Sequence, residues 1–155
     1  MKTQAATTLS AIVAALLILS GAAFAQDKDR VDKISNKAFG ATVRAVENVL
    51  QKNGFMIVSN IDHQNMLVMT GAKLKGLTTI EFGKPEMGKK LFSMAPEAGL
   101  EMPGRFFIWE RGDGKTIVSY RKPSSGFSTY GSEMLTKMGQ DMDGMWTMFA
   151  DEATK

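Results

Sequence analysis

Apolar residues recur along the chain at two spacings, one typical of helices and one typical of strands. Residues 38–52 place them every three or four positions, which predicts a helix with one apolar face, and Gly54 follows as a stop signal. Ser35 and Asn36 are residue types whose side chains cap a helix start. Ahead of them, residues 30–34 have the pattern of a short edge strand.

The next segment predicts a strand followed by a short helix. Residues 55–61 are β-branched and apolar, which favours a well-buried strand with Ile57 and Ile61 on the same side. Asp62 is a residue type that caps helices, and residues 64–69 are long enough for about two helical turns.

Three more strands and a helix are expected before residue 121. A strand over 77–82 ends at residues 83–85, Gly-Lys-Pro, because proline has no amide hydrogen to donate to a sheet. Residues 87–94 predict a helix. Residues 105–110 and 116–120 are aromatic and β-branched, and the Arg-Gly-Asp-Gly segment near their junction is typical of a hairpin turn.

The C-terminal part carries an unusual run of methionines. Residues 124–132 are rich in Ser and Gly and predict an exposed, mobile loop. Residues 133–152 predict a helix that Gly139 and Gly144 should weaken. Five methionines fall on one side of this helix: Met134, Met138, Met142, Met145 and Met148. They indicate packing against the core or a second copy, a flexible binding surface, or a ladder of soft-metal ligands.

The N-terminus has the pattern of an export signal. Lys2 precedes an apolar run over residues 9–19, and Ala23-Phe24-Ala25 is typical of a signal-peptidase site. The apolar run is about 11 residues, shorter than the roughly 20 that span a bilayer. No later stretch is apolar enough to do so. We therefore expect cleavage before Gln26 and a soluble protein, without membrane contact, that is periplasmic or secreted.

These elements predict one α+β domain. The chain divides into a signal peptide at 1–25 and a single domain at 26–155, with a core at 35–123 and a C-terminal helix at 133–152. Hairpins and segregated helices favour a two-layer sandwich: a mostly antiparallel sheet with helices packed on one face, plus the C-terminal methionine-rich helix.

Composition removes several classes of chemistry. The chain has no cysteine, which excludes disulfides, thiolate metal sites and a thiol nucleophile, and its one histidine excludes a multi-histidine site within one chain. Without Lys2 the formal charge falls from +3 to +2. The cationic residues are scattered and form no stripe, so we expect no nucleic-acid partner.

Short blocks in a fixed order connect the sequence to a known family. They are Asn53-Gly54-Phe55, Asp62-His63, Gly71, Leu74, Phe82-Gly83-Lys84-Pro85, Ala95-Pro96, Leu100-Glu101-Met102-Pro103, Ile108-Trp109-Glu110, Gly114, Ser119-Tyr120 and Pro123. Over residues 35–123 the chain resembles the domain-of-unknown-function 302 family. The resemblance implies a two-layer sandwich on an antiparallel sheet, often paired into a dimer, and no established activity or cofactor.

His63 is the main candidate for chemistry because it is the only imidazole and follows a strand end. One interpretation makes it a metal ligand or proton shuttle, with Asp62 or Glu110 fixing its tautomer; the other is a helix-start histidine bonded to backbone. A ligand site here would use Asp62, His63, Lys84, Glu110 and Tyr120. A small hydrolase or isomerase would use His63 with Glu110 or Tyr120.

A soft-metal site is a second use of the same imidazole. His63, Met66 and Met69 follow one another at three-residue spacing, which brings successive side chains together on a helix. Imidazole and thioether groups suit Cu(I) or Ag(I). The alternative is that Met66 and Met69 fill gaps in the core.

The sequence thus predicts an exported small-ligand or soft-metal binding module around His63. Its rivals are the small hydrolase or isomerase and a structural module that pairs through the C-terminal methionine face, with a homodimer as the expected partner state.

N-terminal sequencing and intact mass of the protein from its own host should give a chain that starts at Gln26. A protein that retains residues 1–25 would contradict the export signal.

Overall fold

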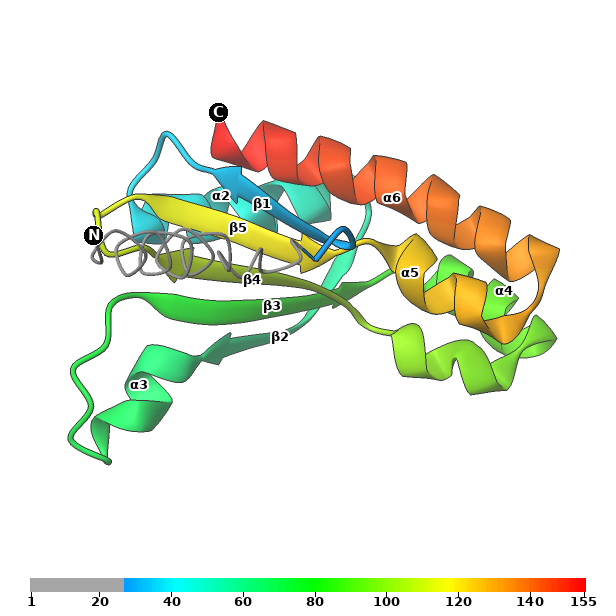
Figure 1. The fold of residues 1–155 in the computed structure, drawn as a ribbon, viewed down its shortest axis with the longest axis horizontal. Coiled ribbons are helices and arrows are strands. Elements are labelled where there is room, and N and C mark those ends of the chain that lie inside the picture. Colours follow the sequence, from blue (N-terminus) through cyan, green and yellow to red (C-terminus); the bar gives the residue numbers. More distant parts are fainter. Residues whose placement is uncertain (1–26) are drawn as a thin grey trace, which may run out of the picture.

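A five-stranded antiparallel sheet runs through the computed structural model, which describes residues 27–155. The predicted export signal lies outside these residues. The strands are ordered β1-β5-β4-β3-β2, and α2 and α6 lie along one face of the sheet (Figure 1). This arrangement confirms the α+β fold with a two-layer architecture.

Most predicted elements are present within a residue or two of their expected ends. The strands are β1 (Arg30–Ile34), β2 (Met56–Asp62), β3 (Leu77–Gly83), β4 (Gly104–Glu110) and β5 (Thr116–Arg121). The helices are α2 (Phe39–Lys52), α3 (His63–Val68), α4 (Pro85–Met94), α5 (Pro123–Phe127) and α6 (Glu133–Thr154), with 3-10 turns η1 (Pro96–Glu101) and η2 (Ser128–Tyr130). Among the described helices, none has both the length and the apolar character that a membrane span requires.

The predicted burial of β2 is wrong. This strand forms an edge of the sheet and alternates between exposed and half-buried positions. Its register with β3 shifts between Ile57 and Ser59, so Val58 has no partner of its own. The extra residue places Ile57 opposite Phe82 but Ile61 opposite Thr79, on different faces of the sheet. Alternation read from the sequence alone put both isoleucines on one side.

The predicted cap of α2 is also wrong. Ala38 occupies the N-cap position, and no side chain caps the helix. The Ser35 hydroxyl instead accepts hydrogen bonds from the Lys37 amide, at 3.1 Å, and from the Thr42 hydroxyl, at 2.8 Å. The side chain therefore stabilises the turn that leads into the helix.

Aromatic side chains hold α6 against the sheet. The Trp146 ring of α6 lies 4.9 Å from the ring of Phe82 and 6.1 Å from that of Phe149, between ring centroids. A Cβ atom on Gly104 would lie 2.6 Å from the Trp146 indole, so only glycine permits this approach. The core of the protein thus lies between α6, α2 and the face of the sheet they cover.

The predicted mobile loop at residues 124–132 is wrong, because α5 and η2 occupy it. The Asp143 carboxylate of α6 accepts hydrogen bonds from the Ser124 amide, at 2.9 Å, and from the Ser124 hydroxyl. Phe127 is fully buried. A carboxylate distant in sequence therefore accepts the hydrogen bond of a free amide in the first turn of α5. Sequence composition alone does not reveal this partner.

The two glycines of α6 should respond oppositely to alanine. A Cβ on Gly139 would lie 2.7 Å from the Ser124 Cα atom, whereas a Cβ on Gly144 would contact nothing within 4 Å. We expect Gly139→Ala to destabilise the protein by about 1–3 kcal/mol through overpacking. Gly144→Ala should stabilise it by up to about 1 kcal/mol through helix propensity. Urea unfolding measures both; equal effects would contradict the close packing of α5 on α6.

Candidate functional site

A hollow opens at the end of the sheet where β4 begins and β5 ends. Its volume is about 670 Å³. It is lined by residues of β1, β4, β5, α5 and α6 and of the turns between them: Asp29, Arg30, Glu101, Pro103, Gly104, Arg105, Phe107, Ser119, Tyr120, Arg121, Lys122, Pro123, Ser125, Gly126, Met142 and Trp146. We call this hollow the arginine cleft.

The sheet register brings the arginines together. Arg30 is paired directly with Arg121 across β1 and β5, and Phe107 is paired with Ser119 across β4 and β5. Arg105 lies two residues before Phe107, so its side chain leaves the same face of the sheet. That face, which points away from α2 and α6, is the open face.

The cationic side chains of the cleft differ in how far they are already neutralised. The Arg30 guanidinium lies 3.0 Å from the Asp32 carboxylate, and the Arg121 guanidinium lies 2.6 Å from that of Asp27. The amide of Asp29 and the Arg121 guanidinium lower the pKa of Asp27. Across residues 27–155, Arg105 forms no ion pair; its cross-strand neighbour Glu81 accepts a hydrogen bond from the Ser59 hydroxyl instead. The Arg105 guanidinium can therefore meet an anion.

Lys122 adds a second cation without a carboxylate partner among residues 27–155, at the start of α5. The cleft lining holds four cationic side chains against two carboxylates, those of Asp29 and Glu101. The Glu101 carboxylate is held in place by the Tyr130 hydroxyl, which donates to it at 3.2 Å, and by contact with Gly126. With Asp32 and Asp27, which pair with Arg30 and Arg121, the formal charges in and beside the cleft balance, and Arg105 and Lys122 are its two cations without a carboxylate partner.

Apolar side chains line the cleft from both faces of the sheet. Trp146 and Met142, both almost fully buried, line it from the helix-covered face, and the partly exposed Phe107 ring lines it from the open face. A hollow with two unpaired cations and an aromatic ring suits a small organic anion with a flat apolar part.

Of the residues predicted for a ligand site, only Tyr120 lines this cleft. Its side chain points to the helix-covered face, where its hydroxyl is 2.9 Å from the Thr147 hydroxyl of α6. Burial raises the pKa of the Tyr120 phenol. A phenol in this state is poorly suited to act as a base near neutral pH.

His63 lies farther along the open face. Its Nε2 atom is 2.7 Å from the Thr79 hydroxyl, and its ring is 6.1 Å from the Phe107 ring, between centroids. Its observed partner is thus a side-chain hydroxyl, and the alternative of a backbone-bonded histidine is wrong for this nitrogen. The Phe107 ring lies in both environments, and so connects His63 with the arginine cleft.

The other three predicted ligand residues form no hydrogen bond with the His63 imidazole and have partners of their own. Asp62 caps α3, accepting from the Asn65 amide at 2.9 Å. Lys84 precedes α4, with its ammonium 5.6 Å from the Phe55 ring centroid. Glu110 ends β4 with its carboxylate 3.8 Å from the Lys75 ammonium. The structure therefore does not gather Asp62, Lys84, Glu110 and Tyr120 around His63.

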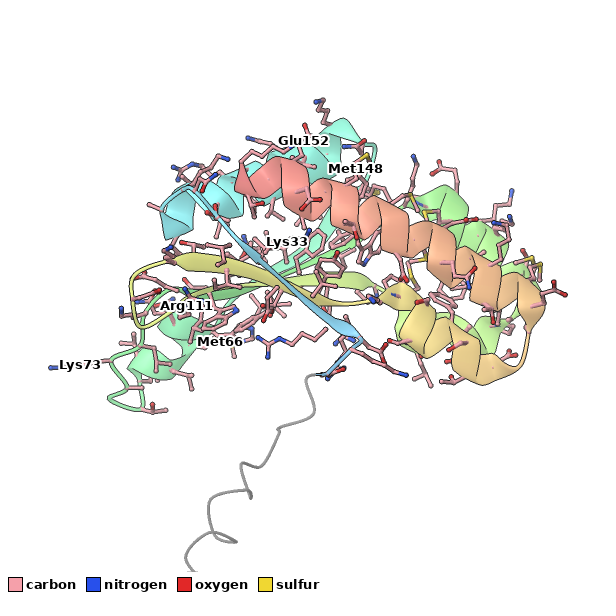
Figure 2. The ribbon with its side chains drawn as sticks, turned by 45° about the horizontal axis from the view of Figure 1, so that its top comes forward. Lys33, Met66, Lys73, Arg111, Met148 and Glu152 are labelled. Atoms are coloured by element: carbon pink, nitrogen blue, oxygen red, sulfur yellow. The ribbon has the colours of Figure 1, made fainter. Side chains whose placement is uncertain are left out.

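Met66 and Met69 are both on the surface beside His63 (Figure 2 labels Met66). Their exposed fractions are 64% and 95%, so the alternative that they fill gaps in the core is wrong. The soft-metal site at His63, Met66 and Met69 stays a prediction. Within residues 27–155 no three His, Cys, Asp or Glu side chains gather as a metal site.

Sequence reasoning missed the arginine cleft because it treated the cationic residues as scattered. Arg30, Arg105 and Arg121 are far apart in sequence and meet only through strand order and register. The sequence feature they share is a position at or next to the end of a strand: Arg30 begins β1, Arg105 is the second residue of β4, and Arg121 ends β5.

Comparison with known proteins gives a family and a fold. The family model described as "Domain of unknown function DUF302" matches residues 31–151. A crystal structure of an uncharacterized conserved DUF302 protein from Bacillus stearothermophilus is similar, with a TM-score of 0.76 and 14% sequence identity. The similarity covers 83% of this chain and 99% of that one. No curated protein matches the chain.

The buried phenol gives a prediction for alkaline pH. Because the chain has two tyrosines, Tyr130→Phe leaves Tyr120 as the only phenol. We expect Tyr120 to ionise above the ordinary pKa of 10, as followed by phenolate absorbance. The stabilisation from its neutral form is complete below pH 10 and is lost as pH rises through the folded pKa. Ionisation at or below pH 10 would contradict the packing of Tyr120 against α6.

Proposed function

Because the chain belongs to the DUF302 family, whose description assigns no activity, we propose a function from its own side chains: an exported module that binds a small organic anion in the arginine cleft. The observation that carries the proposal is the free Arg105 guanidinium beside the Phe107 ring. Arginine suits this role because its planar group recognises carboxylates with two parallel hydrogen bonds.

The dimensions of the cleft support a small ligand. Its volume of about 670 Å³ falls within the range of roughly 300–1,000 Å³ typical of small-molecule sites. Glycine at positions 104 and 126 leaves room for Trp146 and Glu101, which a side chain at either position would meet. In the proposed complex a flat ligand lies on the Phe107 ring while its anionic group meets Arg105 and Lys122.

The proposal moves the predicted ligand site along the open face, from His63 to the cleft. His63 lies on the far side of the Phe107 ring, bonded to Thr79. A ligand longer than the cleft would extend over Phe107 toward this imidazole. His63 then contacts the outer end of the ligand and the arginines hold its charge.

A catalytic use of His63 has less support. The Glu110 and Tyr120 side chains leave the sheet on the face that α6 covers, whereas His63 and Thr79 lie on the open face. An acid-base pair needs its members within hydrogen-bond reach of one substrate. This arrangement favours binding over the hydrolase or isomerase. Export from the cell and pairing into a homodimer, both expected from the sequence, remain part of the proposal.

Binding can be tested with benzoate, which joins a carboxylate to a flat apolar ring, and with its uncharged analogue benzamide. In an NMR titration of the purified protein we expect saturable benzoate shifts at Phe107 and Ser119, and at least fivefold weaker binding of benzamide. Arg105→Gln should weaken benzoate at least fivefold, because it removes the free cation at the cleft.

Arg44→Gln is the matched control, since Arg44 is exposed on α2, forms no ion pair within the described residues and does not line the cleft. It should leave benzoate binding unchanged. Equal loss in both variants would mean a nonspecific charge effect, and benzoate shifts confined to other parts of the protein would refute the proposed site.

A further inference from the structure

Five methionines from two helices line one groove. The groove lies between α4 and α6 and has a volume of about 460 Å³. Its lining is Met87, Lys90, Met134, Lys137, Met138, Asp141, Met142 and Met145. We call it the methionine groove. Five of the twelve methionines in the sequence therefore face a single space.

Packing in the core explains only part of this lining. Met142 is 2% exposed and belongs to the core, as the packing interpretation of the stripe predicted. Met87, Met138 and Met145 are half-buried, and Met134 is 48% exposed. Close-packed interiors leave few voids larger than a water molecule, yet this lining borders an open hollow. The thioethers of Met87, Met134, Met138 and Met145 are therefore accessible to a ligand from solvent.

We infer that the methionine groove binds a soft monovalent metal ion, Cu(I) or Ag(I), through thioether sulfur. Met138, Met142 and Met145 follow the spacing of one helix face over two turns, and Met87 approaches from α4 across the groove. Met134 lies about 16 Å along the helix axis from Met145, so it lines the groove without sharing the same ion. Thioethers are neutral, soft ligands that select such ions, and the three rotatable bonds of methionine let the sulfur atoms adjust around one.

The charges around the groove favour a monovalent ion over a divalent one. The one carboxylate of the lining, on Asp141, is already paired with the Lys137 ammonium at 3.1 Å. Lys90 adds a second ammonium. Repulsion from these lysines acts twice as strongly on a divalent cation. Hard ions also need oxygen ligands that this lining does not offer in number.

The groove and the predicted α3 site use different ligands, which makes them separable. Met66 on α3 and Met148 on α6 lie in separate parts of the molecule (Figure 2). The α3 site needs the His63 imidazole, whereas the lining of the groove holds no imidazole, so substitutions can remove one site and leave the other intact.

Calorimetry with silver nitrate in chloride-free buffer tests the inference. We expect one Ag(I) in the groove, bound at least tenfold more tightly than by free methionine, and no heat from Zn²⁺. The double variant Met138→Leu with Met145→Leu should weaken Ag(I) at least tenfold, because leucine keeps the apolar volume and removes two sulfur atoms. Thermal unfolding confirms that the variant folds.

Two further variants decide between sites. Met148 lies one turn beyond the groove and is half exposed, like Met134. The variant Met148→Leu should therefore leave the Ag(I) affinity unchanged. The triple variant His63→Ala, Met66→Leu and Met69→Leu should also leave it unchanged. Binding lost only in the triple variant, or no tighter than to free methionine, overturns the groove site. Benzoate binding should not respond to the groove variants, so this inference and the proposed function fail independently.

Discussion

The docking of Trp146 against the sheet is the constraint on which the rest of the structure depends. Its indole packs among the rings of Phe55, Phe82 and Phe149, with centroid distances between 4.9 and 6.1 Å. Aromatic pairs of this kind contribute about 0.5–1.5 kcal/mol each beyond the burial of their area. The indole reaches the sheet because residue 104 has no side chain. These contacts fix the position of the 22-residue helix α6.

Both candidate binding regions follow from that position of α6. Trp146 and Met142 line the arginine cleft from the helix-covered face, and Met142 also lines the methionine groove. One buried thioether therefore lies between the two hollows. The same helix is part of the core and borders both of them.

Local patterns in the sequence predicted the elements well, and long-range contacts account for the errors. The hairpin of β4 and β5, the helix α2 and the Asp62 cap depend on neighbouring residues, so periodicity and turn chemistry were sufficient. The segment at 124–132 was mistaken for a loop because its stabilising partner, Asp143, comes from a later helix. The arginine cleft depends on strand order, which a single sequence does not display. His63 was found, but its neighbour Thr79 was not, for the same reason.

The irregular pairing of β2 affects how copies of this protein meet one another. An edge strand offers unpaired amides and carbonyls to any extended chain, and a continuous row of them would let sheets join into long ribbons. In β2 the unpaired Val58 shifts the hydrogen-bonding register partway along the strand. An incoming strand that pairs with one half of β2 is out of register with the other half. The extra residue therefore discourages fibrous self-association along this edge strand.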